Sequence, residues 1–195
     1  CSELALTALV TGNFRRAKEQ LDRVDAISVT DIANSTGNYS DAAYYFSSSI
    51  LYYCGIKDYE SMENTYIHAK QYTENLTADF FAMSVRALGE MMFGSREAAA
   101  ESLRTAEMLA KTHIKSKMPM HRALSAAICA EAHYQLGKPD KAFDDITEAM
   151  NYKISTEFTD YLVARGRTIK DNPEPRSNLT APILGEAMLS PSDFE

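Results

Sequence analysis

Residues 119–152 read PMHRALSAAICAEAHYQLGKPDKAFDDITEAMNY, two apolar-rich stretches that meet at Gly137. Small and large apolar residues stand seven positions before this glycine and five, nine and twelve positions after it, namely Ala130, Ala142, Ile146 and Ala149. Residues at i, i+4 and i+7 lie along one stripe of a helix. A small–large–small stripe lets a preceding helix approach closely, while the large residue fills the space between. The stretch therefore predicts two helices packed as a hairpin.

The same arrangement surrounds three earlier glycines, Gly12, Gly55 and Gly94, so that the four glycines follow one another at spacings of 43, 39 and 43 residues. The matching residues are Ala5, Ala17, Leu21 and Val24, then Ser48, Met62, Tyr66 and Ala69, and finally Ala87, Ala99, Leu103 and Ala106. The pattern after Gly55 starts two residues late because its turn is longer. Each glycine can take positive φ at little cost and so end the first helix of its pair. A repeat of this length predicts stacked helical hairpins, which bind other molecules rather than transform them.

The expected helices form four hairpins and the first half of a fifth. They cover residues 2–11 and 13–27, 40–54 and 57–74, 77–93 and 95–113, 119–136 and 139–152, and finally 156–170. The polar stretch 28–39 is expected to be a long loop or a short extra turn. The sequence DNPEP at 171–175 cannot continue a helix, because proline lacks the amide hydrogen and restricts the residue before it. We therefore expect a repeat domain over 1–170 and a proline-containing linker or tail over 171–195, with one short helix at 181–189.

The composition agrees with a helical protein and argues against two classes of function. Of the 195 residues, only 8 are Gly and 6 are Pro, and 45% are hydrophobic. No stretch reaches the ~18 uncharged apolar residues that a bilayer-spanning helix needs. The net charge of −7 argues against a nucleic-acid-binding surface, because phosphate binding needs clustered Lys and Arg.

The three cysteines, Cys1, Cys54 and Cys129, are odd in number and have no paired spacing. Cys54 and Cys129 lie on apolar helical stretches and are expected to be buried thiols in a reducing compartment, which favours a cytoplasmic location. We expect no disulfide, metal or cofactor. The first residue, Cys1, is expected to mark an excised fragment of a longer protein. A lipoprotein processed at that cysteine is the alternative, although the residues that follow are typical of a helix and not of a tether.

The turn sequences resemble those of tetratricopeptide repeats. Gly12-Asn-Phe-Arg-Arg-Ala and Gly137-Lys-Pro-Asp-Lys-Ala are similar to the turn and second helix of that repeat, and the resemblance covers roughly residues 1–170. It implies an all-α fold, a right-handed superhelical stack of about four to five antiparallel helical hairpins. The repeats here are longer than the standard ~34 residues, and the bulky aromatic residue early in the first helix is mostly missing. Such longer repeats resemble the sensor regions of large LuxR-type, maltose-regulator-like bacterial transcription regulators.

The last seven residues carry a second part of this resemblance. LSPSDFE at 189–195 is similar to the start of the LuxR-type helix-turn-helix module, which commonly opens with Leu, Thr or Ser, and Pro, followed by acidic residues. The resemblance implies that the tail over 171–195 leads to a following DNA-binding domain.

Stacked hairpins form a curved array whose inner face is lined by the first helix of each pair. Positions two, three, six, ten and thirteen before each glycine select that face, which is aromatic and Met-rich with little charge. The candidate binding residues are Tyr45, Ser49, Tyr52 and Tyr53, then Ser84, Leu88, Met91 and Met92, and finally Glu131, Tyr134 and Gln135. Tyr offers contact area and a hydroxyl group, and Met adapts its shape, so the face suits an apolar peptide, a partner helix or a small ligand. The alternative is that these residues pack adjacent repeats together, above all Phe81 and Leu88.

The sequence shows no arrangement of catalytic residues. It has no glycine-rich phosphate loop, no paired cysteine motif, no HExxH and no GxSxG. The four histidines lie on different helices without ligand spacing. Asp144 and Asp145 are adjacent and therefore point to different sides of their helix, and Glu107 and Glu148 are expected as surface charges.

We therefore expect a non-catalytic binding module, the signal-sensing or protein-interaction region of a LuxR-type regulator, that binds neither nucleic acid nor membrane directly. Its effector, a protein, a peptide or a small molecule, would bind the inner face. A constitutive scaffold or an envelope assembly lipoprotein is the alternative. A homodimer through the C-terminal helices is also consistent with the sequence, because Phe158, Tyr161 and Leu162 would form an exposed apolar end if no helix capped the fifth repeat.

Overall fold

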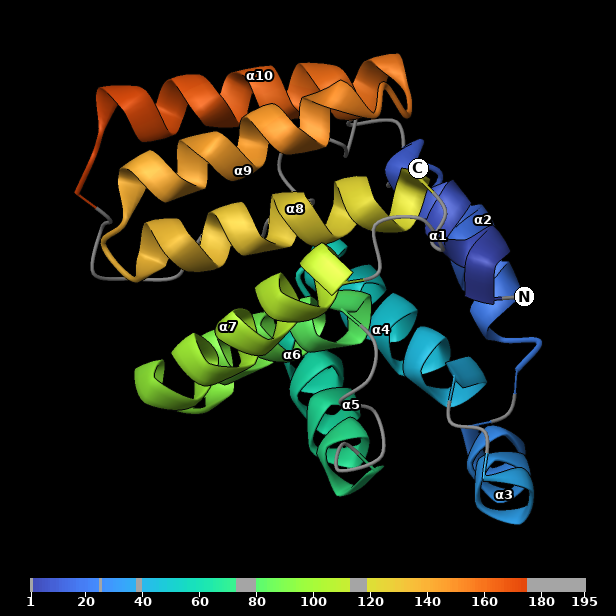
Figure 1. Ribbon diagram of the computed structural model, residues 1–195. Coiled ribbons are helices and arrows are strands. Elements are labelled where there is room, and N and C mark those ends of the chain that lie inside the picture. The colour runs from blue at the N-terminus through green and yellow to red at the C-terminus, as the bar shows by residue number, and fades with distance from the viewer. Residues whose placement is uncertain (1, 25, 38–39, 73–79, 113–118, 175–195) are drawn as a thin grey trace.

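The computed structural model describes residues 2–24, 26–37, 40–72, 80–112 and 119–174, and all regular secondary structure in these residues is helical (Figure 1). The helices are α1 (Ser2–Val10), α2 (Phe14–Leu21), α3 (Ala26–Thr36), α4 (Ser40–Gly55), α5 (Tyr59–Tyr72), α6 (Phe80–Phe93), α7 (Arg96–Thr112), α8 (Pro119–Gln135), α9 (Pro139–Asn151) and α10 (Thr156–Asp171). The predicted all-α class is thus confirmed. The short helix expected at 181–189 lies outside the described residues. Within the described ranges, no helix has both the length and the apolar character that crossing a bilayer requires.

The prediction and the structure differ most at residues 22–39. The helix predicted over 13–27 ends at Leu21, several residues early. The polar stretch 28–39, for which we expect a long loop or a short extra turn, instead forms most of α3, a helix of 11 residues. The hydroxyl groups of Ser35 and Thr36 donate hydrogen bonds of 3.0 and 2.8 Å to the carbonyl oxygen of Ile32, so the helix itself satisfies them. Ala33 is buried, and α3 packs against α4. This contact outweighs the modest helix propensity of Ser, Thr and Asn.

Consecutive helices pack in pairs, α1 with α2, α4 with α5, α6 with α7 and α8 with α9. The first helices of these pairs also pack on one another, α1 on α4, α4 on α6 and α6 on α8, and α10 packs on α9. The small residues of the repeated stripe, Ala17, Ala99 and Ala142, are fully buried. The large residues of the stripe, Leu21, Leu103 and Ile146, are 7%, 2% and 3% exposed. The repeated stripe therefore lies in the helix contacts, where close packing decides how near the helices approach.

The repeat glycines serve two different purposes. Gly12 and Gly137 have φ values of 72° and 76°, the conformation in which glycine ends a helix without strain. Gly55 is buried at the end of α4, and a Cβ added there would collide with the ring of Phe14 from α2. The left-handed residue of that turn is Lys57, with φ of 60°. The expectation of positive φ is therefore correct at Gly12 and Gly137 and wrong at Gly55 and Gly94. At Gly55 the absence of a side chain permits the close approach of Phe14.

The beginning of the chain also contacts its later helices. The Thr7 hydroxyl donates a weak hydrogen bond of 3.7 Å to Sδ of Met120, at the start of α8. The Ser155 hydroxyl, just before α10, donates one of 3.2 Å to the carbonyl oxygen of Val10. One core cluster accordingly extends from α1 to α10, and Figure 1 shows α1 beside the ends of α8 and α10. In a linear array each repeat contacts only its neighbours, so this molecule is more closed than a linear array.

The expectation that Phe158, Tyr161 and Leu162 form an exposed apolar end is wrong. Their side chains are 1%, 6% and 0% exposed, because α10 turns this face toward the core. Burial raises the pKa of the Tyr161 hydroxyl well above its usual range. Ser155 caps the helix by accepting a hydrogen bond of 3.1 Å from the Phe158 amide. A homodimer through the C-terminal helices therefore cannot use these three side chains.

Candidate functional site

The candidate residues on α4 lie at two different depths. Tyr45 and Tyr53 are half-buried, whereas Ser49 and Tyr52 are buried. The Ser49 hydroxyl donates a hydrogen bond of 2.9 Å to the carbonyl oxygen of Tyr45, within its own helix. The rings of Tyr52 and Tyr53 meet edge to face, with centroids 5.3 Å apart. The helix therefore presents two tyrosine side chains toward solvent, supported by a buried tyrosine and a buried serine.

The candidate residues on α6 divide in the same way. Ser84 and Leu88 are 0% and 3% exposed, and the Ser84 hydroxyl donates a hydrogen bond of 2.7 Å to the carbonyl oxygen of Phe81. The burial of these residues is what the core-packing alternative expects. Met91 and Met92, near the end of the helix, are half-buried. The accessible part of this helix face is thus its methionine pair.

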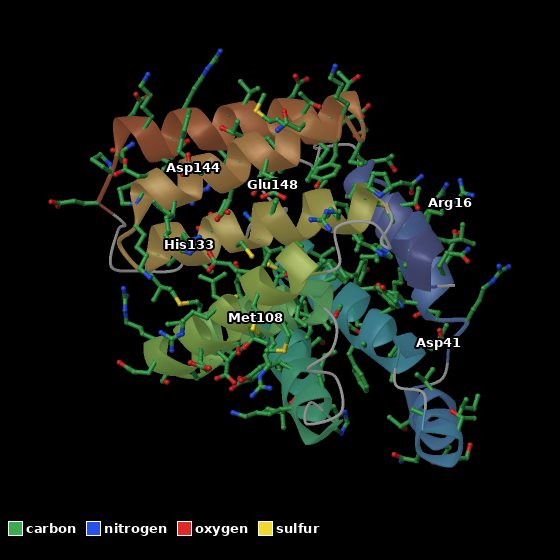
Figure 2. All side chains as sticks on the ribbon, in the orientation of Figure 1. Arg16, Asp41, Met108, His133, Asp144 and Glu148 are labelled. Carbon is green, nitrogen blue, oxygen red and sulfur yellow. The ribbon has the colours of Figure 1, made fainter. Side chains whose placement is uncertain are left out.

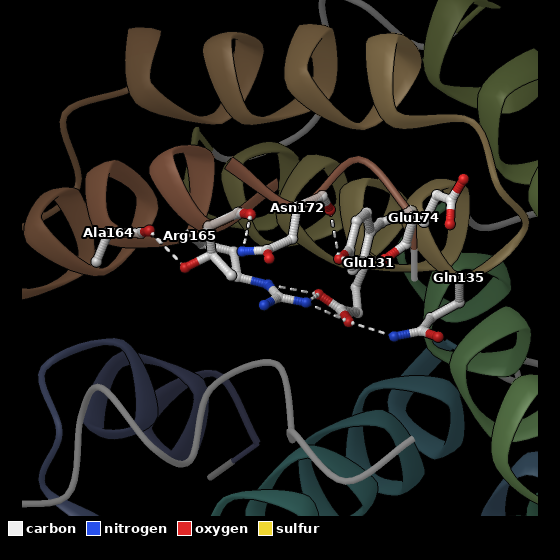
Figure 3. A network of polar contacts seen from close by, with 8 residues as sticks. Glu131, Gln135, Ala164, Arg165, Asn172 and Glu174 are labelled. Atoms are coloured by element: carbon white, nitrogen blue, oxygen red, sulfur yellow. Dashed lines mark hydrogen bonds and ion pairs between the residues drawn. The ribbon is translucent and has the colours of Figure 1, made fainter. Parts of the chain in front are cut away.

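All three candidates on α8 are buried, and they form one polar network with α10 (Figure 3). The Glu131 carboxylate accepts two hydrogen bonds from Arg165, 2.8 Å from Nε and 2.7 Å from Nη2. Gln135 Nε2 donates a third, at 3.1 Å. The Arg165 guanidinium lies 5.2 Å from the ring centroid of Tyr134, whose hydroxyl donates a 2.8 Å hydrogen bond to the carbonyl oxygen of Asn172. The network fastens the C-terminal half of α10 to α8.

Arg165 is the member of this network that the sequence pattern does not reveal. Glu131 is 2% exposed, and a carboxylate at that depth needs a cation and hydrogen-bond donors. A glutamate in the otherwise small and apolar stretch of α8 is the signal for a partner on another helix, but it does not say which basic residue pairs with it. Burial lowers the pKa of Arg165, and the Glu131 carboxylate raises it by more, so the guanidinium stays charged.

A second buried polar cluster joins α7, α8 and α9. Nδ1 of His133 lies 2.7 Å from a carboxylate oxygen of Asp145, and Nε2 lies 3.1 Å from one of Glu107. Figure 2 shows His133 on α8, between α7 and α9. Burial raises the pKa of Asp145, although its hydrogen bond to His133 acts in the opposite direction. The expectation that Glu107 is a surface charge is wrong, because its side chain is only 30% exposed and its carboxylate pairs with the His133 imidazole.

Cys129 lies one turn before His133 but is not an activated thiol. It is buried, and burial raises the pKa of the thiol well above its usual value, with Asp145 acting in the same direction. A thiol held in its protonated form is a poor nucleophile and a poor metal ligand. Within the part of the chain that the structure describes, no group of three or more His, Cys, Asp or Glu side chains is placed to hold a metal ion.

The accessible residues of the candidate set are Tyr45, Tyr53, Met91 and Met92, which we call the Tyr–Met face. They come from α4 and α6, two helices that pack against each other. The remaining candidates, Ser49, Tyr52, Ser84, Leu88, Glu131, Tyr134 and Gln135, are buried beneath the surface. The Tyr–Met face offers apolar contact area and two phenolic hydroxyl groups, chemistry that suits an apolar or amphipathic ligand.

Comparison with known proteins gives no match: no family model, no curated protein and no solved structure matches this chain. The resemblance to tetratricopeptide repeats and to LuxR-type sensor regions therefore remains an expectation from the sequence.

Proposed function

We propose that the chain is a non-catalytic binding module, the signal-sensing or protein-interaction region of a LuxR-type transcriptional regulator. In this proposal the helix pairs form a right-handed α-solenoid of the tetratricopeptide kind. An effector, either a peptide, a protein segment or a small molecule, binds the Tyr–Met face. The following DNA-binding domain, and not this chain, contacts DNA.

The observation that carries the proposal is the half-burial of the Tyr–Met face on two adjacent first helices. Tyr52 and Leu88, on the same two helices, are 8% and 3% exposed, and the ring of Tyr52 meets that of Tyr53 edge to face. Aromatic and thioether side chains on two packed helices combine a fixed position with an adaptable contact surface. Such surfaces suit recognition, because tyrosine rings lose little side-chain freedom on binding and methionine adapts its shape to the ligand.

Contacts between the first helices supply a route from this face to the C-terminal helix. Tyr44 of α4 stacks on His121 of α8 with ring centroids 4.8 Å apart. The pair formed by Glu131 and Arg165 then joins α8 to α10. An effector that prefers one arrangement of α4 on α6 would therefore shift the position of α10, which the tail follows in the sequence.

A thermal-shift screen of metabolites and short apolar peptides tests the binding site. A ligand present at 100 times its Kd stabilises the folded state by about 2.7 kcal/mol, which raises Tm by several degrees. We expect this shift to be lost in Tyr53→Ala/Met91→Ala and kept in Met108→Ala, a control at a 58% exposed position on α7. Mass spectrometry should recover the ligand unchanged. Stabilisation that survives in the double variant would place the site elsewhere.

The regulatory part of the proposal has a separate test. The coding sequence beyond residue 195 should encode a helix-turn-helix, and an electrophoretic mobility shift with residues 1–195 alone should show no specific DNA complex. Specific, tight binding of DNA by residues 1–195 would refute the proposal that only the following domain contacts DNA.

A further inference from the structure

A cleft of about 360 Å³ lies between the start of α9 and the end of α10. Ile169, which is 1% exposed, and Phe143, which is 46% exposed, give it an apolar lining. Asp140 and Asp144 line it from α9, and Lys170 lines it from α10. Its volume lies within the range of roughly 300–1,000 Å³ in which protein clefts hold organic groups.

The exposure of Phe143 is unusual for its place in the repeat. Phe143 stands six residues after Gly137, and the equivalent positions of the other pairs hold Lys18, Glu63 and Ala100. Those residues are polar or small, as expected of the outward side of a second helix. The last complete pair therefore carries an aromatic contact surface that the earlier pairs lack.

The charges around the cleft decide which group fits beside this ring. Asp140 and Asp144 stand one turn apart on α9, and both are exposed. Among the described residues, no cation forms an ion pair with either carboxylate, and this includes Lys170 on the opposite side of the cleft. An aromatic face attracts a cation, and a guanidinium gives up its hydration more readily than an ammonium group does. The cleft is therefore suited to an arginine side chain.

The complementary charge lies on α2 and the turn that follows it. Arg15 and Lys18 contact the two acidic residues of this region, at 4.0 and 2.8 Å. Arg16 and Arg23 are exposed, and within the described part of the chain neither forms an ion pair. They stand seven residues apart, the spacing that returns to the same side of a helix. Two unpaired cations on α2 thus match two unpaired carboxylates on α9.

Figure 2 shows Arg16 and Asp144 far apart on the molecule. One chain therefore does not bring these two side chains together, whereas two chains side by side can. The net charge of −7 opposes contact between copies in most orientations, so that an orientation which pairs opposite charges is favoured over the others.

We propose that the cleft binds a second copy of this chain, which inserts Arg16 of α2 beside Phe143 and the two aspartates. Arg23 of the same copy lies along the rim of the cleft. Each copy has one cleft and one α2, so the contact is head-to-tail, and its repetition gives a ring or an open row of molecules. A contact of this kind is small and polar, and therefore weak and dependent on salt. It uses neither α4 nor α6, so it does not depend on effector binding to the Tyr–Met face.

Sedimentation velocity of the full chain tests this contact. We expect the weight-average mass to rise with protein concentration at low salt and to return to that of one chain at high salt, because added ions screen exposed charges. Arg16→Gln/Arg23→Gln removes the two cations, and Asp140→Asn/Asp144→Asn removes the two carboxylates. Each double variant alone should associate about tenfold more weakly than the wild type. Arg104→Gln, which removes a 68% exposed cation from α7, should associate as the wild type does.

A mixture of the two double variants separates a head-to-tail contact from a symmetric one. The Gln variant keeps an intact cleft and the Asn variant keeps an intact α2, so an equimolar mixture should form pairs with one chain of each and nothing larger. The substituted positions are exposed, and circular dichroism should confirm that both variants fold. A wild type that stays monomeric at every concentration would overturn the proposal. So would association that survives in either double variant, or a mixture that stays monomeric.

Discussion

At the scale of single residues, the buried carboxylates decide which helices are fastened together. Glu131 of α8 pairs with Arg165 of α10, and Glu90 of α6 lies 3.6 Å from Lys70 of α5 and 3.8 Å from Arg86 one turn earlier. A buried ion pair adds little stability relative to apolar residues of the same size, but removing one partner leaves an uncompensated charge. Each pair therefore acts more as a requirement for correct packing than as a source of stability.

Arg165→Met tests this view of the α8–α10 network. The change leaves the Glu131 carboxylate buried without its cation, and we expect the free energy of unfolding to fall by about 3–5 kcal/mol. Adding Glu131→Met should restore most of the loss. Lys18→Met, which breaks a surface pair with Asp22 in which both side chains are more than half exposed, should cost less than about 1 kcal/mol. Urea unfolding measures all three changes. A double variant no more stable than Arg165→Met would mean that lost packing, and not the unpaired charge, causes the effect.

The Asp145 carboxyl group should make stability depend on pH. Its pKa in the folded protein is raised from 3.8, chiefly by burial. The folded state therefore holds this proton more tightly than the unfolded chain does. The resulting stabilisation is fully present below pH 3.8 and is lost as the pH rises through the raised pKa.

Asp145→Asn removes this titration and keeps a group of similar size. We expect the variant to gain stability relative to the wild type as the pH rises from about 4 through the raised pKa. Urea midpoints of both proteins, measured across this range, check the difference. If the wild type instead becomes more stable relative to the variant as the pH rises, the pairing of Asp145 with His133 outweighs the cost of burying the carboxylate.

At the scale of elements, α3 and α8 are opposite extremes of packing. Residues of α8 from Met120 to Gln135 are almost all buried, and α8 packs against α6, α7 and α9. In α3, by contrast, Ile32 is 57% exposed and Asp31 is exposed, and the helix packs chiefly against α4. Few buried apolar contacts mean a low free energy of local opening.

Hydrogen exchange should therefore separate these two helices. We expect the amides of α3 to exchange at least tenfold faster than those of α8, because α3 can open without disturbing the core. Peptide-resolved mass spectrometry after timed exchange measures both rates. The peptide covering α9, whose outer side is exposed, serves as an intermediate reference. Equal protection of α3 and α8 would show that α3 opens only when the whole domain unfolds.

The sequence predicts an element well where its pattern reports on close packing. The stripes around Gly12, Gly94 and Gly137 predict most helix ends within a few residues, because small residues at fixed spacing have few uses other than helix contact. The pattern fails over 22–39, where α3 depends on contact with α4. It also fails for the partner of Glu131, because charge pairing between distant helices leaves no periodic signal.

At the scale of the whole molecule, closure distinguishes this protein from a linear array. The periodic pattern predicts contacts between successive pairs, and it contains no information on whether the first pair meets the last. That meeting depends on individual residues, such as Thr7 with Met120 and Ser155 with Val10. Seven of the eleven candidate binding residues are buried in contacts between neighbouring helices, such as Tyr52 beside Phe14 of α2 and Glu131 against Arg165 of α10. Unfolding should therefore be cooperative across the chain.

Leu9→Ala tests this cooperativity through the two buried thiols. Leu9 is 1% exposed on α1, and the change should cost about 2–5 kcal/mol. In a Cys1→Ser background, thiol labelling under native conditions reports the opening around Cys54 of α4 and Cys129 of α8. In a cooperative domain both thiols should react faster by the same factor, at least about thirtyfold for a loss of 2 kcal/mol. Met108→Ala, at an exposed position, should change neither rate. If Cys54 reacts faster while Cys129 keeps its protection, the pairs open independently, as in a linear repeat, and the contacts of α1 with the later helices contribute little to stability.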